Sequence, residues 1–401
     1  MPVRLARRPS RWMIIAVAAL GVAVAASTAA AVADAAPHGD AQPSIAVTEG
    51  WHVAGVYRGS PSNVDGGMQL QALAAVSSTA AWVAGNYGRS LTVREWNGKT
   101  WRSLAVPPGL SPSPSSEVAV FDSVIAASSA RDMWTFPQAL NTKGPSAATY
   151  GLHWTGASWA KYTFPGDVWP LAAADFGPAS AWLFGQTRQQ NGQTSAYAAR
   201  WNGSTWQTVR APGPLRLLSA PAPDDMWGLA GSDVTHWTGT AWRTVSLPRL
   251  PALGANARWQ PTGIVALGPD NVWVSEVPLV SPSQGSNPPV SAALLHWNGT
   301  GWTITTDRPP GGENNGSLAY DGASGFWLSV GEGDLMANPA TLLNDRNGTW
   351  FRQFAPTEAG YTDYSVSLLT RIPGTRSLWA VAEFDNLHAG ETDTAILKYG
   401  P

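Results

Sequence analysis

Residues 295–302 read "LHWNGTGW", and variants of this phrase recur along the chain. They are "REWNGKTW" at 94–101, "LHWTGASW" at 152–159, "ARWNGSTW" at 199–206 and "THWTGTAW" at 235–242. Asn-Gly between alternating apolar residues is a strong hairpin signal, because a tight primed turn needs residues that accept positive φ. We interpret the phrase as a hairpin between two strands. Its Trp residues are then core, since a residue needed in every repeat is usually scaffold.

A second series of Trp residues lies upstream of each hairpin phrase. Its members are Trp82, Trp134, Trp182, Trp227, Trp273, Trp327 and Trp379, 45 to 54 residues apart. Within each unit, β-branched and aromatic residues alternate with polar ones, and Gly, Pro, Ser and Asn separate the runs. This pattern predicts four short strands per unit, here called A to D. The second Trp series falls in strand B, and the hairpin phrase joins strands C and D.

The two ends of the chain carry complementary halves of one unit. Trp51, in "EGWHVAGVY" at 49–57, has the pattern of a strand D that precedes any complete unit. The chain stops at "ILKYGP", which matches a strand C without a strand D after it. Joined, the two halves seal a ring and remove the exposed sheet edge that would invite aggregation. We therefore predict an all-β, seven-bladed β-propeller over residues 45–401.

Two stretches resemble degenerate Kelch repeats, of the kind that form the central domain of galactose oxidase. They are "VAGNYGRSLTVREWNGKTWRSLAVPP" and "WLFGQTRQQNGQTSAYAARWNGSTWQTVRAPG". The resemblance implies a Gly pair after strand B and a Tyr at the end of strand C. Here Gly85 and Gly185 stand alone, and Trp mostly replaces the Tyr. The resemblance, which covers roughly residues 45–401, implies a fold and no activity.

Composition and the N-terminus predict an exported protein. Four arginines, an apolar run from Met13 and "AVA" at 31–33 have the order of a secretory signal peptide over residues 1–33, followed by a short linker at 34–44. The alternative is an uncleaved anchor, because the apolar run approaches the length of a membrane span. With cleavage we expect a secreted or cell-envelope bacterial protein without a stable membrane span. The net charge of −2 argues against nucleic-acid binding.

Loop lengths predict which face binds a ligand. The A–B and C–D turns are short and uniform, whereas the B–C and D–A connections vary, as function-bearing loops do. Near the start of strand A, on this variable face, the sequence places Trp169, Trp259, Phe121 and Tyr364. An aromatic rim at the channel mouth would suit stacking on sugar rings. The alternative is that these side chains fill the channel or support the D–A loops.

Carboxylates on the same face suggest a competing enzymatic function. Glu276, Glu332 and Glu383 follow strand B in blades 5 to 7, and paired carboxylates can hydrolyse a glycoside. Several together could also hold Ca²⁺, and the simplest alternative is solvated loop charge. No metal trio is expected from His153, His236 and His296, which repeat in three blades. The sequence favours a non-catalytic propeller that binds a carbohydrate or protein partner, with no cofactor, over a glycoside hydrolase or lyase.

Overall fold

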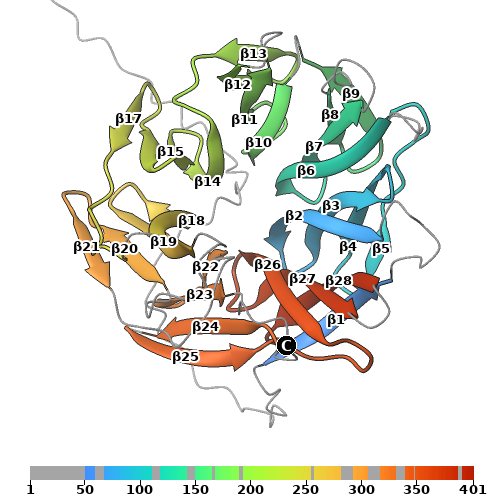
Figure 1. The fold of residues 1–401 in the computed structure, drawn as a ribbon. Coiled ribbons are helices and arrows are strands. Elements are labelled where there is room, and N and C mark those ends of the chain that lie inside the picture. The colour runs from blue at the N-terminus through green and yellow to red at the C-terminus, as the bar shows by residue number, and fades with distance from the viewer. Residues whose placement is uncertain are drawn as a thin grey trace, which may run out of the picture.

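The chain forms a ring of seven four-stranded antiparallel sheets around a central channel (Figure 1). A computed structural model describes residues 50–58, 67–110, 118–141, 150–164, 168–188, 193–253, 257–280, 292–305, 317–330, 339–346, 348–386 and 391–401. Every regular element within these ranges is a β-strand. The predicted seven-bladed propeller is confirmed. The predicted signal peptide and linker lie outside the described residues.

Six blades use consecutive strands, ordered from the channel outwards. Blade 1 is β2 (Met68–Ser77), β3 (Ala80–Tyr87), β4 (Ser90–Trp96) and β5 (Trp101–Ser103). Blade 2 is β6 (Val118–Ser129), β7 (Asp132–Asn141), β8 (Tyr150–Trp154) and β9 (Trp159–Thr163). Blade 3 is β10 (Val168–Asp175), β11 (Ala181–Arg188), β12 (Thr194–Trp201) and β13 (Trp206–Val209).

The remaining consecutive blades follow the same plan. Blade 4 is β14 (Leu215–Ala222), β15 (Asp225–Ala230), β16 (Asp233–Trp237) and β17 (Trp242–Val245). Blade 5 is β18 (Ala257–Gly268), β19 (Asn271–Val280), β20 (Ala293–Trp297) and β21 (Trp302–Thr305). Blade 6 is β22 (Leu318–Tyr320), β23 (Gly325–Val330), β24 (Thr341–Arg346) and β25 (Thr349–Phe354).

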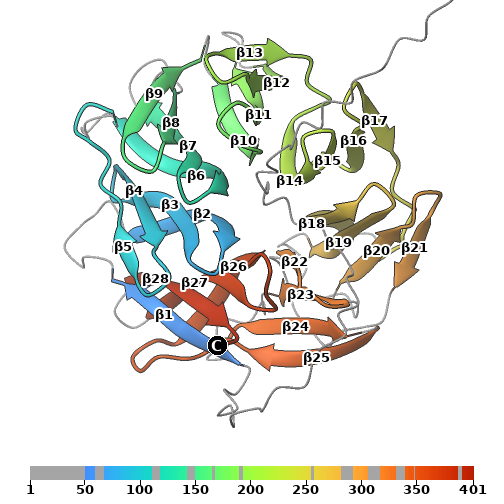
Figure 2. The ribbon, with the colours of Figure 1, turned by 180° about the vertical axis from the view of Figure 1, so that it is seen from behind.

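Blade 7 is built from both ends of the chain, as the sequence predicts. Its strands run in the order β26 (Asp363–Arg371), β27 (Leu378–Asn386), β28 (Glu391–Tyr399) and β1 (Trp51–Tyr57). The first strand of the chain thus forms the outer edge of the last blade (Figure 2). Trp51 pairs with Tyr399, and Tyr57 pairs with Thr394. The two chain ends close the ring through backbone hydrogen bonds.

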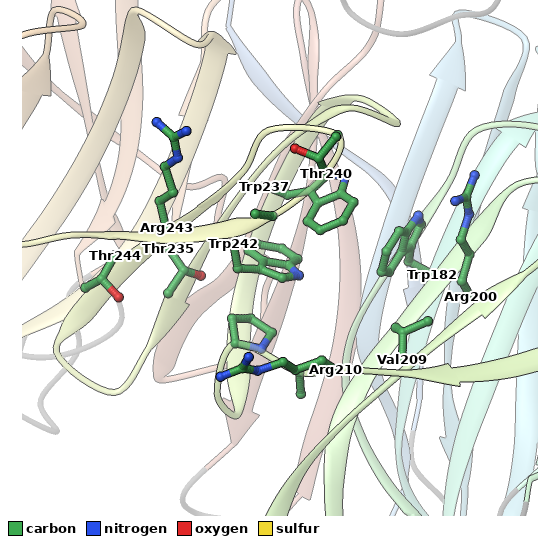
Figure 3. Close-up of a pocket in the computed structure, with 14 residues that line it drawn as sticks. Trp182, Arg200, Val209, Arg210, Thr235, Trp237, Thr240, Trp242, Arg243 and Thr244 are labelled. Carbon is green, nitrogen blue, oxygen red and sulfur yellow. The ribbon is translucent and has the colours of Figure 1, made fainter.

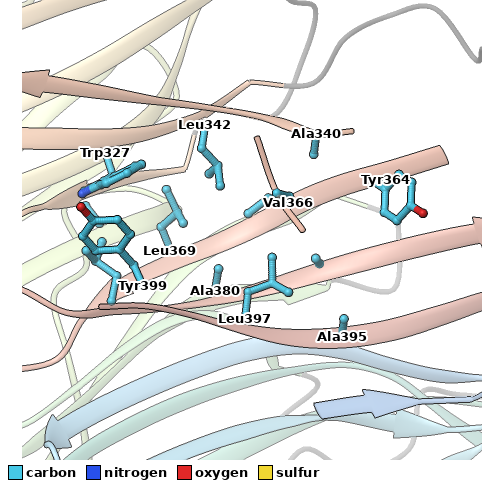
Figure 4. Packing of buried hydrophobic residues seen from close by; sticks show 14 of the residues in the cluster. Trp327, Ala340, Leu342, Tyr364, Val366, Leu369, Ala380, Ala395, Leu397 and Tyr399 are labelled. Carbon is cyan, nitrogen blue, oxygen red and sulfur yellow. The ribbon is translucent and has the colours of Figure 1, made fainter. Parts of the chain in front are cut away.

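The hydrophobic core consists of seven clusters, one at each boundary between neighbouring blades. The Trp of strand B in one blade packs on hairpin aromatics of the next. Trp134 of blade 2, for example, lies 5.2 Å from Trp201 and 5.0 Å from Trp206 of blade 3, measured between ring centroids. At the closing boundary, Trp327 of blade 6 meets Tyr399, with Tyr364 at the other end of the cluster (Figure 4). The hairpin Trp residues are inter-blade packing, as predicted.

The hairpin turn differs from the tight primed turn that the Asn-Gly pair predicts. In blade 5, Trp297 pairs directly with Trp302, so four residues form the loop. The Oδ1 atom of Asn298 accepts hydrogen bonds from the backbone N–H groups of Thr300 and Gly301, at 3.0 and 2.9 Å. Gly299 has φ of 89°. Asn therefore closes the loop through its side chain, and its Gly neighbour adopts the left-handed region.

Within the described residues, the innermost strand carries a β-bulge in six of the seven blades. The register shifts lie between residues 70 and 72, 120 and 122, 170 and 172, 215 and 217, 261 and 263, and 366 and 368. In blade 1 the bulge brings the carbonyl of Gln69 so close to Gly85 that a Cβ atom there would lie 1.9 Å from its oxygen. In blade 3, Gly185 stands in the same relation to the carbonyl of Trp169, at 2.4 Å. These contacts explain the two isolated glycines, which lie within β3 and β11 and not after strand B as predicted.

Candidate functional site

Three of the four aromatic side chains predicted for the channel rim are described, and they lie in different environments. Trp169, in β10, is 39% exposed. Trp259 is half-buried, and its indole N–H donates to the carbonyl of Pro251, at 2.8 Å. Tyr364 is buried, and its hydroxyl donates to the carbonyl of Glu358, at 2.9 Å. The side chain of Phe121 lies outside the described residues.

Pro251 and Glu358 both belong to D–A connections, so Trp259 and Tyr364 support these loops. Trp169 is the rim residue with an exposed ring among the three that the structure describes. A sugar-binding role for the rim stays a prediction.

The carboxylates predicted as alternative catalytic groups are only partly described. Glu276, in β19, is buried, and burial raises its pKa to about 7. Glu383, in β27, is half-buried, and burial together with the nearby charge of Asp385 raises its pKa. Glu332 lies outside the described residues. Of the two carboxylates that the structure describes, Glu276 is the buried one, and its pKa lies in the range that a general acid needs near neutral pH.

Each of the repeated histidines stacks on a Trp and lies within hydrogen-bond distance of an Asp or Asn of its own blade. His153 stacks on Trp134 with ring centroids 4.2 Å apart, and its Nε2 lies 2.6 Å from a carboxylate oxygen of Asp132. His236 repeats the arrangement in blade 4, and His296 in blade 5 with an Asn in place of the Asp. Within the described residues, no group of three His, Asp or Glu side chains could hold a metal ion.

A small cavity of about 250 Å³ lies in the channel, at the end of the innermost strands that leads into the A–B turns. Alanine side chains of blades 1 to 4 form much of its wall, and Asp175 of blade 3 is its acidic group. The Oδ1 atom of Asp175 accepts a hydrogen bond from the backbone N–H of Gly177, at 3.1 Å. Burial, and secondarily the charge of Asp132 in blade 2, raise the pKa of Asp175 to about 8. Burial in the channel therefore favours the protonated form of this carboxyl group.

A wider hollow, of about 660 Å³, lies where blade 7 meets blade 1, on the face formed by the B–C and D–A connections. Its wall includes Tyr57 of β1 and the exposed ring of Tyr87. The guanidinium carbon of Arg94 lies 3.8 Å from the centre of the Tyr57 ring, so this arginine already has an aromatic partner. This hollow lies on the face that loop variation predicts.

The hollow with the most distinctive chemistry lies between blades 3 and 4, and we call it the blade 3–4 pocket (Figure 3). Its volume is about 640 Å³. Blade 4 contributes its C–D hairpin and the strands on either side, from Thr235 to Thr244. Blade 3 contributes Trp182, Arg200 and the chain from Val209 to Pro212, where β13 ends. The pocket is therefore formed jointly by blades 3 and 4.

Three indole rings are the aromatic part of the blade 3–4 pocket. Trp182 is buried, and its ring centroid lies 5.4 Å from that of Trp237. Trp237 in turn lies 5.6 Å from Trp242, at an interplanar angle of 45°. Both hairpin rings are half-buried. The same side chains therefore pack the blade boundary and present aromatic surface to the pocket.

Three arginines surround these rings. Figure 3 shows Arg200 and Arg243 on opposite sides of the hairpin indoles, and Arg210 below them. All three are exposed, and no Asp or Glu lines the pocket. Arg200 lies 5.6 Å from the ring of Trp182 and pairs across the sheet with Gln207, which is uncharged. The pocket is therefore locally positive, although the whole chain carries a net charge of −2.

A comparison of two blades explains why Arg243 lacks a carboxylate partner. In blade 1 the corresponding Arg102 faces Glu95 across the hairpin and forms an ion pair at 3.0 Å. In blade 4 the residue opposite Arg243 is His236. That imidazole is engaged with Asp225, at 2.8 Å. Blade 4 thus has no counterpart of Glu95, and Arg243 remains available to a ligand in the pocket.

The pocket also carries hydroxyl groups. Thr240 and Thr244 are exposed, and both line it. Thr235 is buried, and its hydroxyl points to the carbonyl of Gly228, at 3.5 Å. Aromatic rings, hydroxyls and guanidinium groups together offer both apolar contact and directed hydrogen bonds to one ligand.

Sequence reasoning missed the blade 3–4 pocket, because it assigned the hairpin Trp residues to packing alone and expected the site at the channel rim. One signal was present: Arg200, Arg210 and Arg243 fall in two successive repeats, without an acidic residue at the cross-strand positions opposite Arg200 and Arg243. That signal becomes visible only once the cross-strand register is known.

No protein-family model and no curated protein matches the chain, so the Kelch resemblance stays a prediction. In the described part of the chain, no helix has the length and hydrophobicity of a membrane span. Solved structures with similar backbones include a Hadza microbial sialidase, which is 11% identical at a TM-score of 0.42. The match covers 83% of this chain and 66% of the sialidase chain, so this chain spans just under two thirds of that protein.

Two further structures are similar at comparable levels. A Trypanosoma rangeli sialidase is 11% identical at a TM-score of 0.43, with 88% of this chain and 55% of that chain covered. The structure of BBS1N in complex with ARL6DN is 11% identical at a TM-score of 0.47, with 88% and 97% covered. The propeller architecture and the pocket geometry, rather than these distant likenesses, are the basis for any functional conclusion.

Proposed function

We propose that this propeller is a non-catalytic saccharide-binding protein, and that the blade 3–4 pocket is its binding site. The observation that carries the proposal is that Trp237 and Trp242 present half-buried rings to a hollow that also holds exposed hydroxyl and guanidinium groups. Export, predicted from residues 1–33, would bring the pocket into contact with extracellular or cell-envelope polysaccharides.

Physical chemistry favours a sugar over a purely apolar ligand. A pyranose ring has apolar C–H faces that pack on an indole and hydroxyls at its edge that need polar partners. The pocket offers both kinds of surface within about 640 Å³, a volume within the usual range for small-molecule sites. Both hairpin rings are already held by packing, so little side-chain entropy is lost on binding.

The test is a binding screen of the mature protein against neutral and acidic polysaccharides, followed by isothermal titration calorimetry on each binder. Trp242→Ala should weaken binding at least tenfold, because the indole contributes most of the apolar contact area. A matched control is Trp302→Ala, the same hairpin position in blade 5, where Trp302 packs on Trp297 at 5.6 Å. Both variants lose a similar packing contact, and only one lies in the pocket.

A selective loss in Trp242→Ala supports the proposal. The proposal fails if no polysaccharide binds, or if Trp302→Ala reduces the affinity as much as Trp242→Ala does. Binding that appears only with an extracellular protein would replace the saccharide with a protein partner.

A glycoside hydrolase is the second candidate, favoured by the buried Glu276 with its pKa of about 7. A carboxyl group with this pKa keeps its proton up to near-neutral pH. It can therefore act as the general acid that protonates the leaving oxygen of a glycoside. Glu276→Gln should abolish release of reducing sugars from any polysaccharide that the wild type cleaves. Equal release by both proteins, or none by the wild type, rules out this role.

A further inference from the structure

We infer that the ligand of the blade 3–4 pocket is an acidic polysaccharide, whose carboxylate or sulfate groups bind Arg200, Arg210 and Arg243. This inference rests on the proposed saccharide-binding function and adds the charge of the ligand. Its basis is that three exposed arginines line one hollow that has no lining carboxylate.

The arginines are suited to anions because no described carboxylate neutralises their charge; the ring of Trp182, 5.6 Å from Arg200, leaves that charge in place. Neither Arg200 nor Arg243 faces an acidic residue across the sheet, and no ion pair joins any of the three to a described carboxylate. A guanidinium group presents parallel N–H donors that match the two oxygens of a carboxylate or sulfate. Next to half-buried indoles, such a hydrogen bond is less exposed to water than on an open surface.

The arrangement favours a chain of charged sugars over one isolated anion. Arg200 and Arg243 lie on opposite sides of the hairpin indoles (Figure 3), so one small anion would leave part of the cluster unpaired. A polymer with an acid group on successive sugars can offer anions on both sides while its ring faces contact Trp237 and Trp242. Thr240 and Thr244 lie within the same hollow, where they can meet sugar hydroxyls.

Other polyanions fit less well. Nucleic-acid binding usually relies on a broad basic surface with a strongly positive charge, whereas this chain has a net charge of −2 and the pocket contributes three arginines. An acidic peptide would pair with the arginines but would not use the aromatic and hydroxyl surface in the same way. The ligand class that matches all three kinds of side chain is the acidic polysaccharide.

Calorimetry with matched polymer pairs tests the inference. Polygalacturonate is compared with its methyl ester, and dextran sulfate with dextran; the first pair reports on carboxylates and the second on sulfates. We expect the charged member of at least one pair to bind at least tenfold more tightly, and its affinity to fall as salt rises from 50 to 500 mM, since screening weakens exposed charge interactions.

Single substitutions locate the charge recognition. Arg200→Gln, Arg210→Gln and Arg243→Gln should each weaken binding of the charged polymer about tenfold, the usual effect of losing one charge-assisted hydrogen bond. Arg102→Gln is the matched control, because it removes the corresponding arginine of blade 1, outside the pocket. Thermal unfolding of each variant verifies that the fold is intact.

The outcomes separate this inference from the proposed function. If neutral and charged members of both pairs bind equally, and the arginine substitutions have no effect, the inference is wrong and saccharide binding stands. If poly-glutamate or a single-stranded oligonucleotide binds as tightly, with the same losses in the variants, the saccharide class is wrong. If no polysaccharide binds at all, the proposed function itself is overturned.

Discussion

Trp51 lies directly opposite Tyr399 in the last blade, and their ring centroids are 5.5 Å apart. The two residues come from distant parts of the chain, yet they form the hairpin aromatic pair that one continuous segment supplies in each of blades 1 to 5. Trp51 also meets Trp327 of blade 6 edge-on, at 5.3 Å. The ring is therefore closed by backbone pairing and by aromatic packing at the same place.

Trp51→Ala should destabilise the whole propeller, because it removes packing at the closing boundary. We expect a loss of about 3 kcal/mol in the free energy of unfolding, near the lower end for a core Trp because Trp51 is half-buried. Chemical denaturation followed by circular dichroism measures the change. His52→Ala, the next and exposed residue of β1, is the control and should change stability by less than about 0.5 kcal/mol. An unchanged midpoint for Trp51→Ala would show that closure depends on backbone pairing alone.

Gly85→Ala should be strongly destabilising, although it adds a single methyl group. The new Cβ would lie 1.9 Å from the carbonyl oxygen of Gln69, so the bulged strand would have to move. We expect a cost of about 2 kcal/mol or more, as for other overpacked sites. Gly301→Ala is the control, since nothing lies within 4 Å of a Cβ atom there. Equal thermal unfolding temperatures for the two variants would contradict the close approach.

Asp175 should make stability depend on pH. Its pKa is about 8 in the folded protein and near 3.8 in the unfolded chain, so folding takes up a proton between these values. Stability therefore falls as pH rises from about 4 to about 8, by at most about 1.4 kcal/mol per pH unit from this group. Denaturation midpoints for wild type and Asp175→Asn, measured at several pH values, should show a shallower decline in the variant. Parallel curves would mean that Asp175 is ionised in the folded state. The control is Asp233→Asn, because Asp233 is exposed.

Trp169→Ala distinguishes the two candidate faces. The side chain is 39% exposed, so its removal should cost little stability. If saccharides bind in the blade 3–4 pocket, this variant should keep wild-type affinity while Trp242→Ala loses it. The opposite result, measured by the same calorimetry, would move the binding site to the channel rim that the loop variation predicts.

The sequence was sufficient for the architecture because the repeats are redundant. Seven strand-B Trp residues and their hairpin phrases define the unit, and Trp51 with Tyr399 defines how the ring closes. Packing is local in such a fold, since each blade contacts mainly its two neighbours. A periodic pattern of large side chains therefore specifies both the blade and the boundary between blades.

The site was less predictable because it depends on cross-strand and inter-blade relations. The glycine at 85 is visible in the sequence, but the bulge that requires it is not. Arg102 and Arg243 occupy the same position in two repeats and have similar local sequences. Arg102 is neutralised by Glu95, whereas Arg243 lies opposite His236, a side chain that carries no negative charge.

By itself, the sequence determined the number of blades, the strands within each blade and the joining of the chain ends, because apolar periodicity and turn residues act over short distances. The tertiary structure decided which repeated side chains remain only scaffold and which also line a pocket. That distinction depends on the residues that a neighbouring blade brings opposite them. Trp242 and Trp302 are equivalent in sequence, and only Trp242 lies beside Arg200 and Arg210 of the preceding blade.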